Sequence, residues 1–286
     1  MSERSTGQSV DLTARLRETA EPRRAGLSRK HREWVAGYLF VLPDLIGLII
    51  FLGIPMVLAL SLGFFEVDGF GHYTWIGLDN YHAMVHDDRA YLGFWDGGMV
   101  VIDITDPTSP ATISRLGWEE GGHTHTCLPL PERDLVVVTD EAITDGCEGA
   151  RHMVRVVDIS DETTPFVRSI CPVPEGDFCE RGLRFGSHCL HENRPNSYRS
   201  QELVFVTYFN AGLRVYDLAD PDDPVEIAHW IPQCPPNQAA AQINDVFVAE
   251  DHTVYVTDRI NGGVYVLEPD LALSARMTQS AARASS

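Results

Sequence analysis

One sequence pattern recurs four times in the last two thirds of this 286-residue chain and limits what that part can fold into. Each copy contains two short runs rich in Val, Ile, Leu and Tyr, separated by a turn or an insertion. The equivalent ends of the copies are 55, 59 and 49 residues apart, at Asp106, Asp161, Asp220 and Pro269. Short alternating runs between turn residues are typical of β-strands. A period of this length indicates an array of similar β-units.

Each unit is expected to form four strands. The second unit provides two central runs, Leu135–Asp140 and Val154–Asp161, and the third provides an outer run, Pro224–Trp230. Four such strands form the blade of a β-propeller, which normally closes with about four to eight blades. The first unit lacks an inner strand and the last lacks a clear outer strand. We therefore predict a mainly β fold, with a partial propeller of about three to four four-stranded blades over residues 89–270 and a flexible tail over 271–286.

The third unit contains a clear copy of the repeated consensus, in the run Gly212–Pro221. This consensus, Gly-Leu-x-Val-x-Asp-Ile/Leu-x-Asp-Pro, closely resembles the LVIVD repeat of a family of bacterial extracytoplasmic proteins. The resemblance covers about residues 89–269. It implies a propeller scaffold outside the cytoplasm and does not imply a particular reaction.

A second constraint comes from the stretch between Val35 and Phe65, which has one charged residue, Asp44. A bilayer core needs only about 20 apolar helical residues, and membrane helices tolerate prolines such as Pro43 and Pro55. The alternatives are a buried core helix and a cleavable signal peptide, whose apolar region is shorter and nearer the N-terminus. We predict an uncleaved transmembrane helix over residues 34–66.

The charge distribution predicts how this helix is oriented. Residues 1–32 contain eight basic and four acidic side chains, whereas residues 91–286 contain 13 basic and 30 acidic ones. Because basic flanks stay in the cytoplasm, we expect a cytoplasmic tail over 1–33 in a single-pass protein of the inner or plasma membrane, with the β-region outside. The net charge of −19 argues against nucleic acid as a partner.

All six cysteines follow the predicted membrane segment, on its exported side. An oxidising compartment permits disulfides between them, and six cysteines allow fifteen pairings, which the sequence leaves open. The six are Cys127, Cys147, Cys171, Cys179, Cys189 and Cys234.

The membrane segment itself resembles part of a transporter. The run Ala36–Gly47, the pair Ile54-Pro55 and the later run Trp75–Tyr81 resemble the first transmembrane helix, and the segment after it, of sugar-type ABC transporter permeases. The resemblance covers about residues 30–85. A permease needs at least five further helices, and no second apolar stretch of about 18 residues follows Phe65. The resemblance therefore implies a fusion of a permease start to a propeller through a linker at 67–88, with ABC transporter subunits as possible partners.

Two strings rich in His and Cys occupy the start of the inner strand in the second and third units. Inner strands line the central channel of a propeller, and imidazole and thiolate together suit copper or zinc. Aligning the first cysteine of each string, Cys127 with Cys189, places Thr126 opposite His188, with Asn244 and Asp245 in the fourth unit. The candidate metal ligands are His123, His125, Cys127, His188, Cys189 and His191.

Two interpretations of these strings remain open. They distantly resemble His/Cys segments of the selenium-binding-protein family, which implies a metal-dependent oxidoreductase. Alternatively, the histidines only form hydrogen bonds in a polar channel, and the module binds an unidentified extracytoplasmic ligand.

Arg151, Arg181 and Arg184 lie in insertions and are either ligands for an anion or solvated surface residues. No Gly-rich phosphate loop, serine nucleophile elbow or His-Glu-x-x-His motif occurs, so a binding module is favoured over an enzyme.

The recurring aspartates also allow two interpretations. Asp103, Asp158 and Asp217 are equivalent in three units. They follow expected strands, where Asp typically accepts hydrogen bonds from backbone N–H groups of the turn. We therefore expect turn residues here, and not calcium ligands.

Overall fold

A computed structural model describes residues 28–62, 64–67, 73–75, 85–86, 88–118, 122–149, 151–234 and 240–283. The chain divides into two compact units, Met1–Ser61 and Leu62–Ser286. The predicted cytoplasmic tail therefore lies almost entirely outside the described residues.

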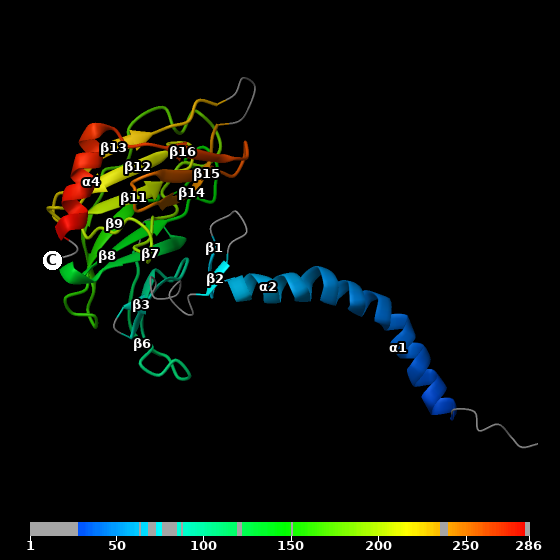
Figure 1. The fold of residues 1–286 in the computed structure, drawn as a ribbon. Helices are drawn as coiled ribbons and strands as arrows, with labels where there is room; N and C mark the ends of the chain where they lie inside the picture. The colour runs from blue at the N-terminus through cyan, green and yellow to red at the C-terminus, as the bar shows by residue number, and fades with distance from the viewer. Residues whose placement is uncertain are drawn as a thin grey trace, which may run out of the picture. The chain divides into compact units, whose positions relative to one another are not determined.

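The described part of the first unit is an apolar helix in three consecutive segments: α1 (Arg29–Leu48), a π-helical segment η1 (Ile49–Gly53) and α2 (Ile54–Leu62), whose last residue belongs to the second unit (Figure 1). The helix begins after Ser28, whose hydroxyl accepts a hydrogen bond from the His31 N–H group. The π turn ends just before Pro55, which has no N–H group to donate to the preceding turn. Residues Glu33–Leu58 are long and apolar enough to cross a membrane, as predicted.

The second unit is mainly β, as predicted, and contains a small hairpin and four larger antiparallel sheets (Figure 1). The hairpin pairs β1 (Phe65–Val67) with β2 (Tyr73–Trp75). The first sheet contains β3 (Val85–His86), β4 (Arg89–Gly93), β5 (Met99–Asp103) and β6 (Ala111–Leu116). The second sheet contains β7 (Thr124–Leu130), β8 (Leu135–Asp140), β9 (Val154–Asp158) and β10 (Phe166–Ile170). A 3₁₀ turn, η2 (Pro131–Arg133), lies between β7 and β8. The third contains β11 (Leu203–Thr207), β12 (Leu213–Asp217) and β13 (Val225–Trp230), and the fourth contains β14 (Ile243–Val248), β15 (Val254–Asp258) and β16 (Val264–Leu267).

The inner and outer strands differ in part from the prediction. The first sheet has a two-residue inner strand, β3, where none was expected. In the third sheet, the inner position is occupied by an irregular segment that bridges to β11 at Leu190 and Val206. The fourth sheet has no outer strand, as predicted, among the described residues. Two four-stranded and two three-stranded sheets therefore represent the four sequence units.

The hydrophobic core lies between successive sheets. Strands β8, β9, β11 and β12 are buried along nearly their whole length, because the second and third sheets each pack against a neighbour on both faces. Three clusters of buried residues fill the junctions: one between the first and second sheets, one between the second and third, and one between the third and fourth. The outer strand β13 instead alternates between exposed and partly buried residues. The four sheets thus form one array packed face to face.

The recurring aspartates are turn residues, as expected. The side chain of Asp103 accepts a hydrogen bond from the Thr105 N–H group at 2.9 Å. Asp158 and Asp217 accept equivalent bonds from residues two positions further along, at 3.0 and 2.9 Å. Each carboxylate closes a turn in the way that Asp does at hairpin ends.

The C-terminal residues form a helix, α4 (Leu271–Arg283), so the predicted flexible tail is wrong over these positions. Asp270 caps the helix by accepting the Leu273 N–H group at 2.8 Å. Leu273, Met277 and Ala281 recur every four residues and pack into the junction between the third and fourth sheets. Figure 1 shows α4 beside β12 and β13. The helix is therefore part of the fold.

A disulfide joins Cys147 to Cys179. It connects the insertion between β8 and β9 with the loop that follows β10. Among the described residues, Cys127, Cys171, Cys189 and Cys234 are free thiols. Of the six cysteines, the structure thus pairs two, so it forms none of the fifteen connectivities in which all six are paired.

Candidate metal site

The register of the inner segments determines which residues of the two His/Cys strings are equivalent. In the second sheet, Cys127 pairs with Val138 on β8. In the third sheet, Leu190 pairs with Val206, which occupies the same place on β11. Cys127 is therefore equivalent to Leu190, and the predicted alignment of Cys127 with Cys189 is wrong by one residue.

The backbone hydrogen bonds give the same result. The Thr126 N–H group donates to the Thr139 hydroxyl at 3.2 Å, and the Cys189 N–H group donates to the equivalent Thr207 hydroxyl at 3.0 Å. The register shift in β7 lies before Cys127 and does not change this alignment, which the sequence missed because it matched the two cysteines by residue type. The corrected alignment makes the residues before Thr126 and Cys189, the two histidines His125 and His188, equivalent.

The same two threonines connect each sheet to the next. The Thr139 hydroxyl donates to the backbone carbonyl of His188 in the following sheet. The Thr207 hydroxyl donates to the backbone carbonyl of Asn244, one sheet further on, at 3.0 Å. In the first sheet the equivalent residue is Gly93, and a Cβ atom there would lie 2.5 Å from the carbonyl oxygen of His125. The backbone carbonyls of the equivalent residues His125, His188 and Asn244 thus all lie close to the preceding sheet. Two of them accept a threonine hydrogen bond from it, and the third lies beside Gly93.

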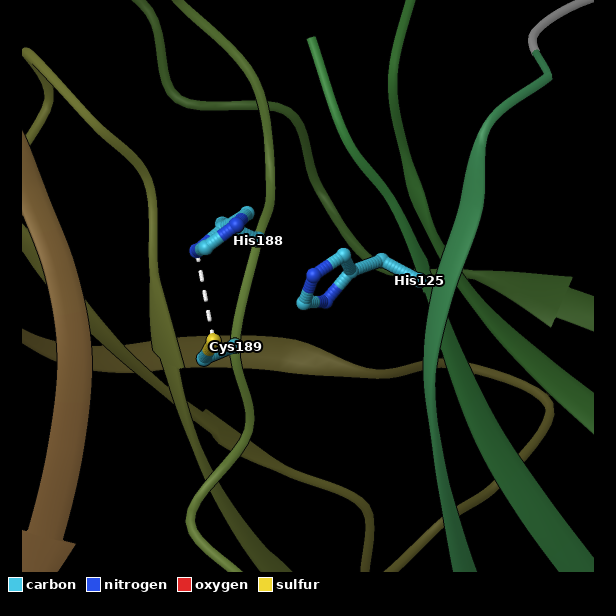
Figure 2. Close-up of side chains that lie close together, drawn as sticks. All are labelled: His125, His188 and Cys189. Atoms are coloured by element: carbon cyan, nitrogen blue, oxygen red, sulfur yellow. Dashed lines mark hydrogen bonds between the residues drawn. The ribbon is translucent and has the colours of Figure 1, made fainter. Parts of the chain in front are cut away.

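This register brings His125, His188 and Cys189 together (Figure 2). Their ligand atoms all lie within 4.8 Å of one another. The two imidazole rings are 4.2 Å apart between centroids, and the Cys189 Sγ lies 3.2 Å from the His188 Nδ1. His188 and Cys189 come from one segment, and the His125 side chain points toward them from the neighbouring sheet (Figure 2). Three of the six predicted ligands therefore form one cluster.

The surroundings of His188 favour a neutral imidazole with a free Nε2 atom. Its Nδ1 lies 2.7 Å from the carbonyl oxygen of Asn244, which only accepts hydrogen bonds, so Nδ1 carries the proton. Burial lowers the pKa of His188, and the nearby His125 lowers it further, although the Asn244 carbonyl acts in the opposite direction. Histidines that bind metals commonly donate their other ring N–H group to a backbone carbonyl in this way.

The thiol of Cys189 is protonated at neutral pH in the metal-free protein. Burial raises its pKa to about 12, and the carboxylates of Asp245 and Glu141 add to the effect. A metal ion would offset this cost, because a coordinating thiol loses its proton.

A carboxylate and two guanidinium groups border the cluster. The Oε1 atom of Glu141 lies 3.7 Å from the His188 Nε2, 2.9 Å from the Arg184 Nη1 and 3.9 Å from the Arg259 Nη1. Arg184, one of the three predicted anion ligands, is therefore paired with a carboxylate. Glu141 was not predicted, although it directly follows a strand of the repeated pattern and so lies at the same end of its sheet as the cluster.

His123 lies outside the cluster. It adopts a positive φ of 59°, and its ring packs edge-on against Trp95 with 4.9 Å between centroids. Its other neighbours are His152, with 5.9 Å between the ring centroids, and Asp96, whose Oδ1 is 3.6 Å from the His123 Nε2.

Cys127 and His191 also lie outside the cluster. Cys127 packs in the junction between the first and second sheets, where burial raises the pKa of its thiol strongly. The His191 Nε2 lies 2.8 Å from the carbonyl oxygen of Tyr198, and its Nδ1 accepts the N–H group of Val248 at 3.2 Å. Both nitrogens of this buried ring are thus already used within the protein.

A cavity of about 800 Å³ lies among the insertions of the second sheet. It is lined by the Cys147–Cys179 disulfide, Arg151 and His152, and it does not include the cluster. Arg181, the remaining predicted anion ligand, pairs with Asp177 at 2.6 Å.

Two comparisons with known proteins agree with parts of this description. The LVIVD repeat model matches residues 83–116, which include the whole first sheet. A protein of Bacillus subtilis (strain 168), described as probable ABC transporter permease protein YesP, is 44% identical over 57 residues, which are 20% of this chain and 18% of that protein. The chain thus spans less than a fifth of the length of this curated relative.

Proposed function

We propose that this chain is a membrane-anchored extracytoplasmic binding module of the β-propeller type, and that it binds copper or zinc through His125, His188 and Cys189. One observation carries the proposal: three ligand atoms from two neighbouring sheets converge within 4.8 Å, and two of them belong to the equivalent histidines His125 and His188. Within the described part of the chain, this is the one group of three such side chains close enough to share an ion.

The donor set fits this class of metal. Two neutral imidazoles and a thiolate suit zinc and copper(I), and they do not suit hard ions such as calcium or magnesium. Three protein ligands leave a coordination position for a water molecule or for a group from a partner. The Asn244 carbonyl supports the proposal, because it holds the His188 ring with its Nε2 free.

The location outside the cytoplasm is supported by independent features. An apolar helix long enough to span a bilayer precedes the sheets, and basic residues outnumber acidic ones only in the segment before it. The Cys147–Cys179 disulfide is typical of an oxidising compartment. The match to an LVIVD repeat agrees with the extracytoplasmic location that this resemblance implies.

Metal content tests the proposal directly. The full chain is purified in detergent, stripped with a chelator, loaded with Zn²⁺ or Cu⁺ and measured by inductively coupled plasma mass spectrometry. We expect one ion per chain, and at least about tenfold weaker retention in H188A and in C189S, as for the loss of one ligand. The matched control is H229A, because His229 is exposed on β13. Equal metal content in wild type, H188A and C189S would refute the site, and so would an unloadable wild-type chain.

A second candidate function is that of a transport component. The 57 residues similar to the permease support it, since this segment would associate with ABC transporter subunits through the membrane helix. Co-purification of an ATPase subunit in mild detergent would support this candidate, and a solitary chain would oppose it. A peptide spanning residues 81–96, detected by mass spectrometry in membranes of the source cells, would establish that the permease-like and repeat-containing parts form one protein.

A further inference from the structure

The fourth sheet exposes positions that the other three sheets bury. On β15 and β16, Tyr255 pairs with Val266, and Thr257 pairs with Val264. The same register relates Val137 to Val156, and Thr139 to Val154, in the second sheet. Three apolar positions per sheet are therefore equivalent throughout the array. They are Tyr91, Met99 and Val101; Val137, Val154 and Val156; Phe205, Leu213 and Val215; and Tyr255, Val264 and Val266.

Burial separates the last set from the first three. In the first three sheets none of these side chains is more than 8% exposed, because each set lies in the junction with the following sheet. In the fourth sheet Tyr255, Val264 and Val266 are 39%, 60% and 62% exposed. Phe247 is directly paired with Tyr255 and is 40% exposed. The fourth sheet thus ends in an apolar surface, the terminal face, defined by Phe247, Tyr255, Val264 and Val266.

The first sheet exposes the complementary position on its opposite face. Leu92 occupies the place of Val138, Val206 and Val256, which are each fully buried against the preceding sheet. Leu92 is 40% exposed. The chain therefore has both halves of a sheet-to-sheet junction, one at each end of its array.

We propose that this chain forms a dimer. The terminal face of each protomer packs on the partner's first sheet, on the face that carries Leu92, which we call the Leu92 face. Each contact continues the junction that already joins neighbouring sheets within the chain, with apolar residues at the same positions. Two copies bring together eight sheets, within the range of about four to eight in which propellers close. A head-to-tail contact that closes after two copies is a ring with a two-fold axis.

The oligomeric state of the full chain tests this inference. Static light scattering in detergent, corrected for bound detergent, is expected to show a dimer that dissociates on dilution. V266E and L92E each place a carboxylate in both junctions, and we expect each to raise the dissociation constant by at least about 100-fold, as for burial of an unpaired charge. The matched control F166E adds the same charge at an exposed apolar position on the outer strand β10, and its dissociation constant should equal that of wild type.

Mixing the two variants distinguishes this ring from other dimers. V266E has an intact Leu92 face, and L92E has an intact terminal face, so a mixture can form one unaltered junction and should recover dimers that neither variant forms alone. A contact between two terminal faces, or one made by the membrane helices, would not be restored by mixing. A monomeric wild-type chain, a dimer unaffected by V266E, or a mixture without recovery would each refute the proposal. Thermal unfolding of both variants, with the Cys147–Cys179 disulfide intact, checks that they remain folded.

Discussion

Gly93 illustrates how a single residue controls the approach of two sheets. Any side chain there meets backbone, because a Cβ atom would lie 2.5 Å from the His125 carbonyl oxygen and 3.0 Å from that of Thr124. These two carbonyls belong to the strand that carries His125, one of the three proposed ligands. The first and second sheets can therefore approach this closely only with glycine at position 93.

We predict that G93A destabilises the protein by about 1–3 kcal/mol, the usual cost of overpacking. The same change should weaken metal retention, because the backbone of His125 must move away from Gly93, which alters the position of the His125 side chain relative to His188. Urea unfolding and metal titration measure the two effects. G117A is the control, since a Cβ atom at Gly117 meets nothing within 4 Å. Equal stability and equal metal retention in G93A and wild type would show that the junction is looser than described.

At the same scale, the sequence located the residues of the candidate site better than it predicted their register. The two strings of His and Cys correctly located the segments that converge, and His125, His188 and Cys189 were among the candidates. The two strings were aligned by residue type, which is one residue off the observed register, and His191 turns into the packed core instead. Side-chain type shows which metals a residue suits, whereas the direction of a side chain depends on register, which residue type alone does not determine.

The docking of helix α4 depends on charge. Arg276 forms two hydrogen bonds with Asp217, at 2.6 and 2.8 Å, and one with Glu202 at 2.7 Å. Burial alone would raise the pKa of Glu202, but hydrogen bonds from Arg276 and Arg283 outweigh it and lower that pKa below 4.5. A carboxylate with a lowered pKa stabilises the folded state above its unfolded pKa, and the contribution is lost as pH falls.

We therefore predict that α4 detaches on acidification, as the pH falls from about 4.5 through the lowered pKa of Glu202. Hydrogen exchange followed by mass spectrometry should show protection of 271–283 at pH 7 and its loss at acid pH, before the central strands exchange. In R276Q the helix should be less protected at pH 7 and should depend less on pH in this range. Protection of α4 that is independent of pH in the wild-type chain would contradict this view.

Among the elements, strands were easier to predict than the terminal helix. The β-branched runs of β8, β9, β11 and β12 are buried on both faces, so their sequences are almost continuously apolar and their type is clear. The sequence of α4 is rich in Ala and Ser, and Met277 is one of its few large apolar residues. Its amphipathic spacing and the cap at Asp270 were present in the sequence, but a composition typical of a flexible end concealed them.

The topology of the whole chain is testable through its cysteines. If the sheets lie outside the cytoplasm, a membrane-impermeant maleimide should label Cys147 and Cys179 in intact cells after mild reduction. In the variant S28C, the added thiol should react only after the membrane is permeabilised. Labelling at position 28 in intact cells, identified by mass spectrometry of the peptide that contains it, or a reduced Cys147–Cys179 pair in freshly isolated membranes, would oppose an exported module.

The threonine contacts between sheets have a consequence for how such a chain arises. Thr139 and Thr207 each bond the backbone carbonyl of the following unit, and that carbonyl is available whatever side chain the unit carries there, whether His188 or Asn244. This hydrogen bond therefore depends on the threonine of one unit and requires no particular side chain in the next unit. Unequal recombination between gene copies can therefore add, delete or exchange a unit, and the hydrogen bond to the next sheet is kept. The side chains at the residues whose carbonyls accept this bond are then free to diversify.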